Sequence, residues 1–88
     1  MLSTTAKSNA LAVCRDAAKA ARLGYEMITQ HPFADANKRT AAVLIIAYMR
    51  LCGYKFKPRS EDFYEIIYGV AEGSFGFEDI LHFVENSL

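Results

Sequence analysis

The run AAVLIIAYM at residues 41–49 constrains the fold more than any other feature, because nine consecutive side chains in it are apolar. Helix-forming residues surround this run, and the sequence predicts a helix from about Lys38 to Cys52. A helix without a polar side is buried all round in a globular protein. We therefore expect it to lie at the centre of the fold, enclosed by the other elements. The run is too short to cross a bilayer, which takes about 20 apolar residues.

Three other segments have helical periodicity. Residues 5–30 place apolar side chains three and four positions apart on one stripe, in which Gly24 is a weak point for a bend or a boundary. Pro32 is expected to end this helix at His31. Gly53 is the expected stop of the second helix, Ser60 the expected N-cap of a third, and residues 73–76 a turn before a fourth. The stripe consists of Leu11, Cys14, Ala18, Ala21, Tyr25 and Ile28. These patterns predict an all-α class, a small bundle of four helices.

The composition, with 52% hydrophobic and 23% charged residues among 88, is typical of a single compact domain covering residues 1–88. Neither a signal peptide nor a membrane span is recognisable. Cys14 and Cys52 lie in apolar runs without metal-ligand spacing, so we expect buried free thiols and a cytoplasmic protein. Ten basic residues balance ten acidic ones, which argues against nucleic-acid binding through Lys38, Arg39, Lys55, Lys57 and Arg59.

Polar chemistry is concentrated in HPFADANKRTAA, residues 31–42, at the junction of the first two helices. A helix N-terminus offers unpaired backbone N–H groups and the positive end of the helix dipole, and small Ala36 lets a ligand approach these amides. Lys38 and Arg39 are unfavourable there unless an anion lies in front of them. Asp35 is a candidate Mg²⁺ ligand beside a phosphate, and His31 a candidate general base. Each residue alone has a structural explanation, as a cap or a solvated face, but their combination favours a site.

This segment resembles the Fic/Doc family motif H-P-F-x-(D/E)-G-N-G-R, and is most similar to the Doc (death-on-curing) form H-x-F-x-D-A-N-K-R-T-A. A weaker resemblance extends over roughly residues 17–85. It implies that the predicted central helix follows the H-x-F-x-D-A-N-K-R loop of a Fic/Doc core. It also implies that His31 deprotonates a target hydroxyl, that Asp35 binds the metal ion, and that Phe33 anchors the loop. The implied anion hole for nucleotide phosphates consists of Asn37, Lys38 and Arg39 with the backbone amides around Ala36.

Two positions distinguish the chain from AMP-transferring Fic enzymes. Lys38 replaces the second glycine of G-N-G-R, and Ala42 replaces a second arginine. The Doc form shares this lysine, and the resemblance implies a reversed nucleotide and transfer of its terminal phosphoryl group. We therefore expect Mg²⁺ and ATP, or another nucleoside triphosphate, as cofactors. The expected function is a kinase-type toxin acting on a Ser/Thr hydroxyl of a cytoplasmic protein, with a translation factor as the expected target and AMP transfer as the alternative.

The resemblance also implies partners. A toxin of this kind is held in check by a small antitoxin protein, and no membrane partner is expected. The N-terminal segment with the target-positioning flap of Doc-type proteins has no counterpart upstream of His31, so the domain is expected to be short at its N-terminus. The remaining alternative is an inactive remnant that binds a nucleotide or a partner protein.

Overall fold

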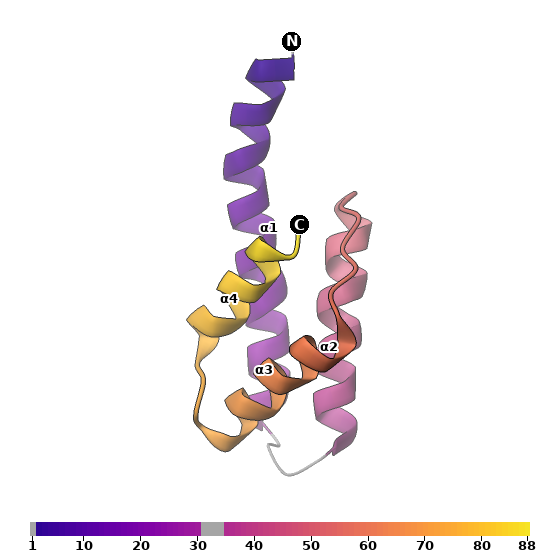
Figure 1. Cartoon of the computed structure of the whole chain (residues 1–88), viewed down its shortest axis with the longest axis vertical. Helices are drawn as coiled ribbons and strands as arrows, with labels where there is room; N and C mark the ends of the chain where they lie inside the picture. Colours follow the sequence, from indigo (N-terminus) through magenta and orange to yellow (C-terminus); the bar gives the residue numbers. More distant parts are fainter. Residues whose placement is uncertain (1, 31–34) are drawn as a thin grey trace.

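The computed structural model describes residues 2–30 and 35–88, with side chains from residue 11 onward. Within these ranges the chain forms four helices, α1 (Leu2–Gln30), α2 (Asp35–Leu51), α3 (Ser60–Glu72) and α4 (Phe77–Asn86) (Figure 1). The described ranges contain no strand, which confirms the all-α class. None of the helices described is long and apolar enough to cross a membrane.

α1 is the helix against which α2, α3 and α4 all pack. It continues without a break through Gly24, which is buried against α2, so no boundary occurs there. A Cβ atom at Gly24 would lie 2.9 Å from Cγ1 of Ile45 and even closer to Cδ1. The glycine therefore serves the close approach of two helices, which single-sequence periodicity does not reveal. The N-terminal half of α1 extends beyond the other helices (Figure 1).

The buried stripe of α1 differs from the predicted one. Its centre is a set of small residues, Ala17, Ala20, Ala21 and Gly24, followed by Ile28. Leu11 is 67% exposed, and both Cys14 and Cys52 are exposed, so the prediction of buried thiols was wrong. Small side chains predominate on the buried side of α1 because they let the axes of α1 and α2 come close together.

α2 is buried on one side only, so the expectation of complete enclosure was wrong. Its buried residues are Ala41, Ala42, Ile45 and Met49, whereas Val43 is 62% and Leu51 86% exposed. Among the described residues α2 packs against α1 and α3 but not against α4. The physical reason is that only α1 and α3, among the described helices, reach α2, which leaves its outward side without a covering element.

The chain leaves α2 through the turn that the sequence predicts at Gly53, whose φ of 97° favours glycine. The Gly53 and Tyr54 N–H groups donate to the Arg50 and Met49 carbonyls, at 3.0 and 3.1 Å. Residues 54–59 then form an irregular connection to α3. In it Phe56 is fully buried, and the Tyr54 hydroxyl donates to the Asp16 carboxylate of α1 at 2.8 Å. This connection therefore packs back against the middle of α1.

The ends of α3 and α4 agree largely with the predicted turns. Ser60 is the first helical residue rather than the N-cap, and Arg59 at the cap position makes no side-chain capping bond. Gly73 ends α3 with a φ of 88°, and the Gly76 N–H donates to the Asp79 carboxylate at 2.8 Å at the start of α4. The ring of Phe63 stacks on Phe83, with 5.3 Å between centroids, and joins the two helices.

Candidate functional site

The candidate site is the N-terminal turn of α2. Asp35, Ala36 and Asn37 were expected to precede the helix, but the helix begins at Asp35 and contains all three. The carboxylate of Asp35 thus stands in the first turn, where the helix dipole favours a negative charge. His31 and Phe33 lie outside the described residues, and their roles as base and anchor stay predictions.

The residues of this turn differ in exposure. The Asp35 side chain is 77% exposed, Ala36 and Arg39 are also exposed, and Asn37 is partly buried. The Thr40 hydroxyl donates to the Ala36 carbonyl at 2.7 Å, a bond within α2 that stabilises its first turn. The first four N–H groups of an α-helix lack intrahelical acceptors. The exposed end of α2 therefore combines the elements of an anion site with one accessible carboxylate.

Lys38 does not extend into solvent as a basic residue at a helix N-terminus usually would. Its side chain is only 13% exposed, and its Nζ lies 3.1 Å from Oδ1 of Asp35. The same ammonium lies 5.3 Å from the centroid of the Tyr68 ring. The ion pair at spacing i,i+3 and the aromatic face offset the unfavourable position near the helix dipole. Lys38 and Arg39 are therefore distinct parts of the site, one held in place and one exposed.

Tyr68 is the site residue that sequence reasoning missed. It belongs to α3, as does Tyr64, and lies outside the segment 31–42 in which the sequence concentrates its polar chemistry. The two rings stack with 6.0 Å between centroids and an interplanar angle of 29°. The spacing of four residues indicates a shared helix face, but it contains no sign that this face meets the first turn of α2. Only the packing of α3 against α2 brings Tyr68 to Lys38.

A metal ion at this end of α2 has a limited set of protein ligands. No group of three or more His, Cys, Asp or Glu side chains suited to a metal occurs in the part of the chain that the structure describes. Asp35 supplies one carboxylate, with Oδ1 engaged by Lys38. Mg²⁺ commonly takes one or two carboxylates and completes its shell with waters and substrate phosphates. The donor set thus fits Mg²⁺ brought with a nucleotide better than a resident metal centre.

Comparison with known proteins places the motif in a family context. A family model described as the Fic/DOC family matches residues 5–49. The match includes most of α1, the whole segment 31–42 and nearly all of α2. It begins earlier than the resemblance noted from the sequence and stops before α3, so the resemblance of residues 50–85 stays a prediction. No curated protein and no solved structure matches the chain significantly.

Proposed function

The chain belongs to the Fic/DOC family, and from this premise we propose that it is a Doc-like toxin that phosphorylates a Ser or Thr hydroxyl of a cytoplasmic protein. The family transfers nucleotidyl or phosphoryl groups. The observation that carries the choice of phosphoryl transfer is the lysine at position 38, held beside Asp35 where AMP-transferring members have a glycine. The proposed target is a translation factor, and the proposed regulator is a small antitoxin.

In the proposed reaction, His31 takes the proton of the target hydroxyl as its oxygen attacks the γ-phosphorus. The new O–P bond forms, the bond between the γ-phosphorus and the β,γ-bridging oxygen breaks, and the nucleoside diphosphate leaves. The backbone amides near Ala36, with Asn37 and Arg39, stabilise the charge on the phosphate oxygens. Phe33 anchors the loop that carries His31.

Asp35 and Lys38 are the residues that would hold Mg²⁺ and the phosphates of a bound nucleotide. Asp35 would hold Mg²⁺ together with phosphate oxygens, and the ion would neutralise charge that develops on them. Oδ1 of Asp35 is paired with the Lys38 ammonium at 3.1 Å, so a metal ion held by this oxygen would compete with the ammonium group. Lys38 would then be free to pair with the phosphates. Tyr68 keeps the lysine at the mouth of the site during this exchange.

The test uses purified protein, Mg²⁺, cell extract and ATP labelled on the α- or the γ-phosphate. We expect ATP labelled on the γ-phosphate to label a protein band. ATP labelled on the α-phosphate should label none. The His31→Ala variant should lose this labelling, whereas His82→Ala, a change at the exposed histidine of α4, should retain it. Asp35→Asn should also lose it, with Asp62→Asn in the first turn of α3 as the matched control.

The other outcomes separate the alternatives. Label from α-ATP alone would show AMP transfer and overturn the kinase proposal. Nucleotide binding without labelling of any protein would indicate a silent member that binds nucleotide or a partner protein. Labelling that persists unchanged in His31→Ala would remove the histidine as the base.

A further inference from the structure

The charges of this chain are segregated along the sequence, although their sum is zero. Residues 1–59 contain all ten basic residues and three of the ten acidic ones, whereas residues 60–88 contain the other seven acidic residues and no basic one. The acidic part begins where α3 begins and includes α4. A protein with a net charge near zero has no overall repulsion between its copies, so separate regions of opposite charge can attract one copy to another.

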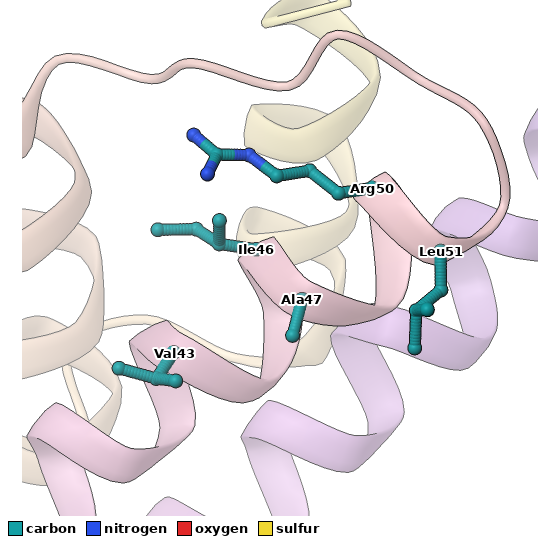
Figure 2. A pocket seen from close by; sticks show the side chains of 5 residues that line it. All are labelled: Val43, Ile46, Ala47, Arg50 and Leu51. Atoms are coloured by element: carbon teal, nitrogen blue, oxygen red, sulfur yellow. The ribbon is translucent and has the colours of Figure 1, made fainter.

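Few of these charges are paired within the molecule. Two ion pairs occur among the described side chains, and each joins residues three apart in the sequence. They are Lys38–Asp35 and Arg59–Asp62. Arg50 contacts the backbone instead, since its Nε donates to the Phe56 carbonyl at 3.3 Å, and Figure 2 shows its side chain beside Ile46 on the apolar outward side of α2. Within the described side chains, no ion pair therefore joins a basic residue of α1 or α2 to an acidic residue of α3 or α4.

The basic residues in the middle of α1 form a stripe on its exposed side. Arg15, Lys19 and Arg22 are exposed, and their spacing of four and three residues places them on one face of the helix. Arg15 precedes Gly24 by nine positions, a rotation of about 180° at 3.6 residues per turn, so this face is turned away from α2. The Cζ atom of Arg22 lies 5.3 Å from the centroid of the Phe77 ring of α4. We call these three basic residues the α1 stripe.

An acidic stripe with the same spacing lies on α3. Glu61, Glu65 and Glu72 are exposed, and Tyr68 between them is 43% exposed. The four residues follow one another at intervals of four, three and four, which places them on one face of the helix. We call them the α3 stripe. Because Tyr68 also contacts Lys38, this stripe reaches the margin of the candidate site.

We propose that this chain self-associates head to tail, with the α1 stripe of one copy against the α3 stripe of a second copy. Antiparallel helices with this common spacing form two Arg–Glu pairs and one contact of an ammonium group with an aromatic ring. The pairs are Arg15–Glu72, Lys19–Tyr68 and Arg22–Glu65. Glu26 continues the α1 stripe and would lie opposite Glu61, so like charges limit the contact to these three pairs.

A second copy is the occupant that the charges favour, because one chain carries both stripes and they match in spacing and differ in sign. The two stripes lie on different helices, so the contact is heterologous and leaves one stripe of each kind free at the ends of the assembly. Exposed ion pairs are individually weak and are screened by salt. We therefore expect a weak association that salt dissociates.

The test is analytical ultracentrifugation of the purified chain over a range of protein concentrations. In about 20 mM NaCl the weight-average mass should rise with concentration above the 9.8 kDa of one copy. In about 0.5 M NaCl, where charges are screened, it should return to the mass of one copy. The measurement needs neither nucleotide nor a target protein, so its outcome is independent of the proposed transfer reaction.

Charge reversal tests which surfaces meet. Arg15→Glu/Arg22→Glu and Glu65→Arg/Glu72→Arg should each give single copies in low salt, because stripes of like charge then oppose each other. An equal mixture of these two double variants should associate again, which also shows that both are folded. Lys55→Glu/Lys57→Glu changes the net charge as much as the α1 double change, at exposed lysines outside both stripes, and should associate like the unmodified chain.

Four results would overturn the proposal. They are a mass of one copy at every concentration in low salt, an association that salt does not weaken, an association that persists in either stripe variant, and a mixture of the two variants that stays dissociated. Loss of association in Lys55→Glu/Lys57→Glu to the same extent as in Arg15→Glu/Arg22→Glu would also contradict it, since net charge rather than the stripes would then control the assembly.

Discussion

Tyr68 of α3 covers the ammonium group of Lys38 of α2, with 5.3 Å between Nζ and the ring centroid. The contact joins the first turn of α2 to α3, a helix that lies outside the range of the family match. Together with the ion pair to Asp35, it keeps the side chain of Lys38 largely buried instead of extended into solvent. Four predictions concern this contact and the packing that supports the site.

Removal of the ring should weaken the hold on Lys38. A cation over an aromatic face contributes roughly 0.5–1 kcal/mol at an exposed site. We expect Tyr68→Leu to lower MgATP affinity about two- to fivefold in calorimetric titration. Tyr68→Phe retains the ring and should bind like the unmodified protein. In a Lys38→Met background, Tyr68→Leu should have no further effect, and a loss of equal size there would show that the tyrosine acts on something else.

Replacement of the lysine by glycine should change which phosphorus is attacked. Glycine removes the ammonium group and its pairing with Asp35, and leaves the backbone amides open to a diphosphate. In the assay with α- and γ-labelled ATP, Lys38→Gly should lower γ-label transfer and raise the share of α-label. Lys55→Gly, at an exposed lysine outside the site, should keep the original ratio. An unchanged ratio in Lys38→Gly would remove this residue as the determinant of the product.

Gly24→Ala should destabilise the fold although alanine is the better helix former. The added Cβ would overlap the end of the Ile45 side chain, and overpacking of this kind costs about 1–3 kcal/mol against a gain of about 1 kcal/mol in propensity. We therefore expect a lower free energy of unfolding in urea. Ile45→Val removes the overlapping methyl, so the double variant should be more stable than the two single effects predict. Strict additivity would contradict the contact.

Tyr54→Phe should change how stability depends on pH. Desolvation, with the hydrogen bond to Asp16 as a second cause, raises the Tyr54 pKa to about 12 from an ordinary value of 10.0. The neutral phenol is thus favoured in the folded state, and its contribution is complete below pH 10 and lost as the pH rises toward 12. Chemical unfolding at pH 9 and pH 11.5 should show a larger loss for the unmodified protein than for Tyr54→Phe. Equal losses would exclude this linkage.

The sequence was sufficient for the helices and turns because their signals are local. The proline at position 32, the glycines at 53, 73 and 76, and the carboxylates of Glu61 and Asp62 act through backbone conformation and the helix dipole, which depend on near neighbours. The observed helices α1 to α4 begin and end within a few residues of the predicted positions. The motif residues 35–39 were likewise predicted together, and the structure gathers them in one turn.

The errors concern contacts between helices. Gly24 was interpreted through its propensity, but its neighbour Ile45 decides its role. α2 was expected to be enclosed because its own residues are apolar, but enclosure depends on how many other elements reach it. Tyr68 could not be assigned to the site from its spacing in the sequence, because it reaches Lys38 only through the packing of α3 against α2. Burial and partnership between distant segments are properties of packing, and one sequence contains them only indirectly.

The connection between α1 and α2 is confined to residues 31–34, and these two neighbours in sequence make the most extensive helix contact in the described structure. Contacts between helices that are neighbours in sequence are local, and local contacts form quickly during folding. The same four positions contain the predicted base and anchor. An insertion between Gln30 and Asp35 would change the spacing between the predicted base and the first turn of α2, so the proposed chemistry and the pairing of α1 with α2 depend on the same four positions.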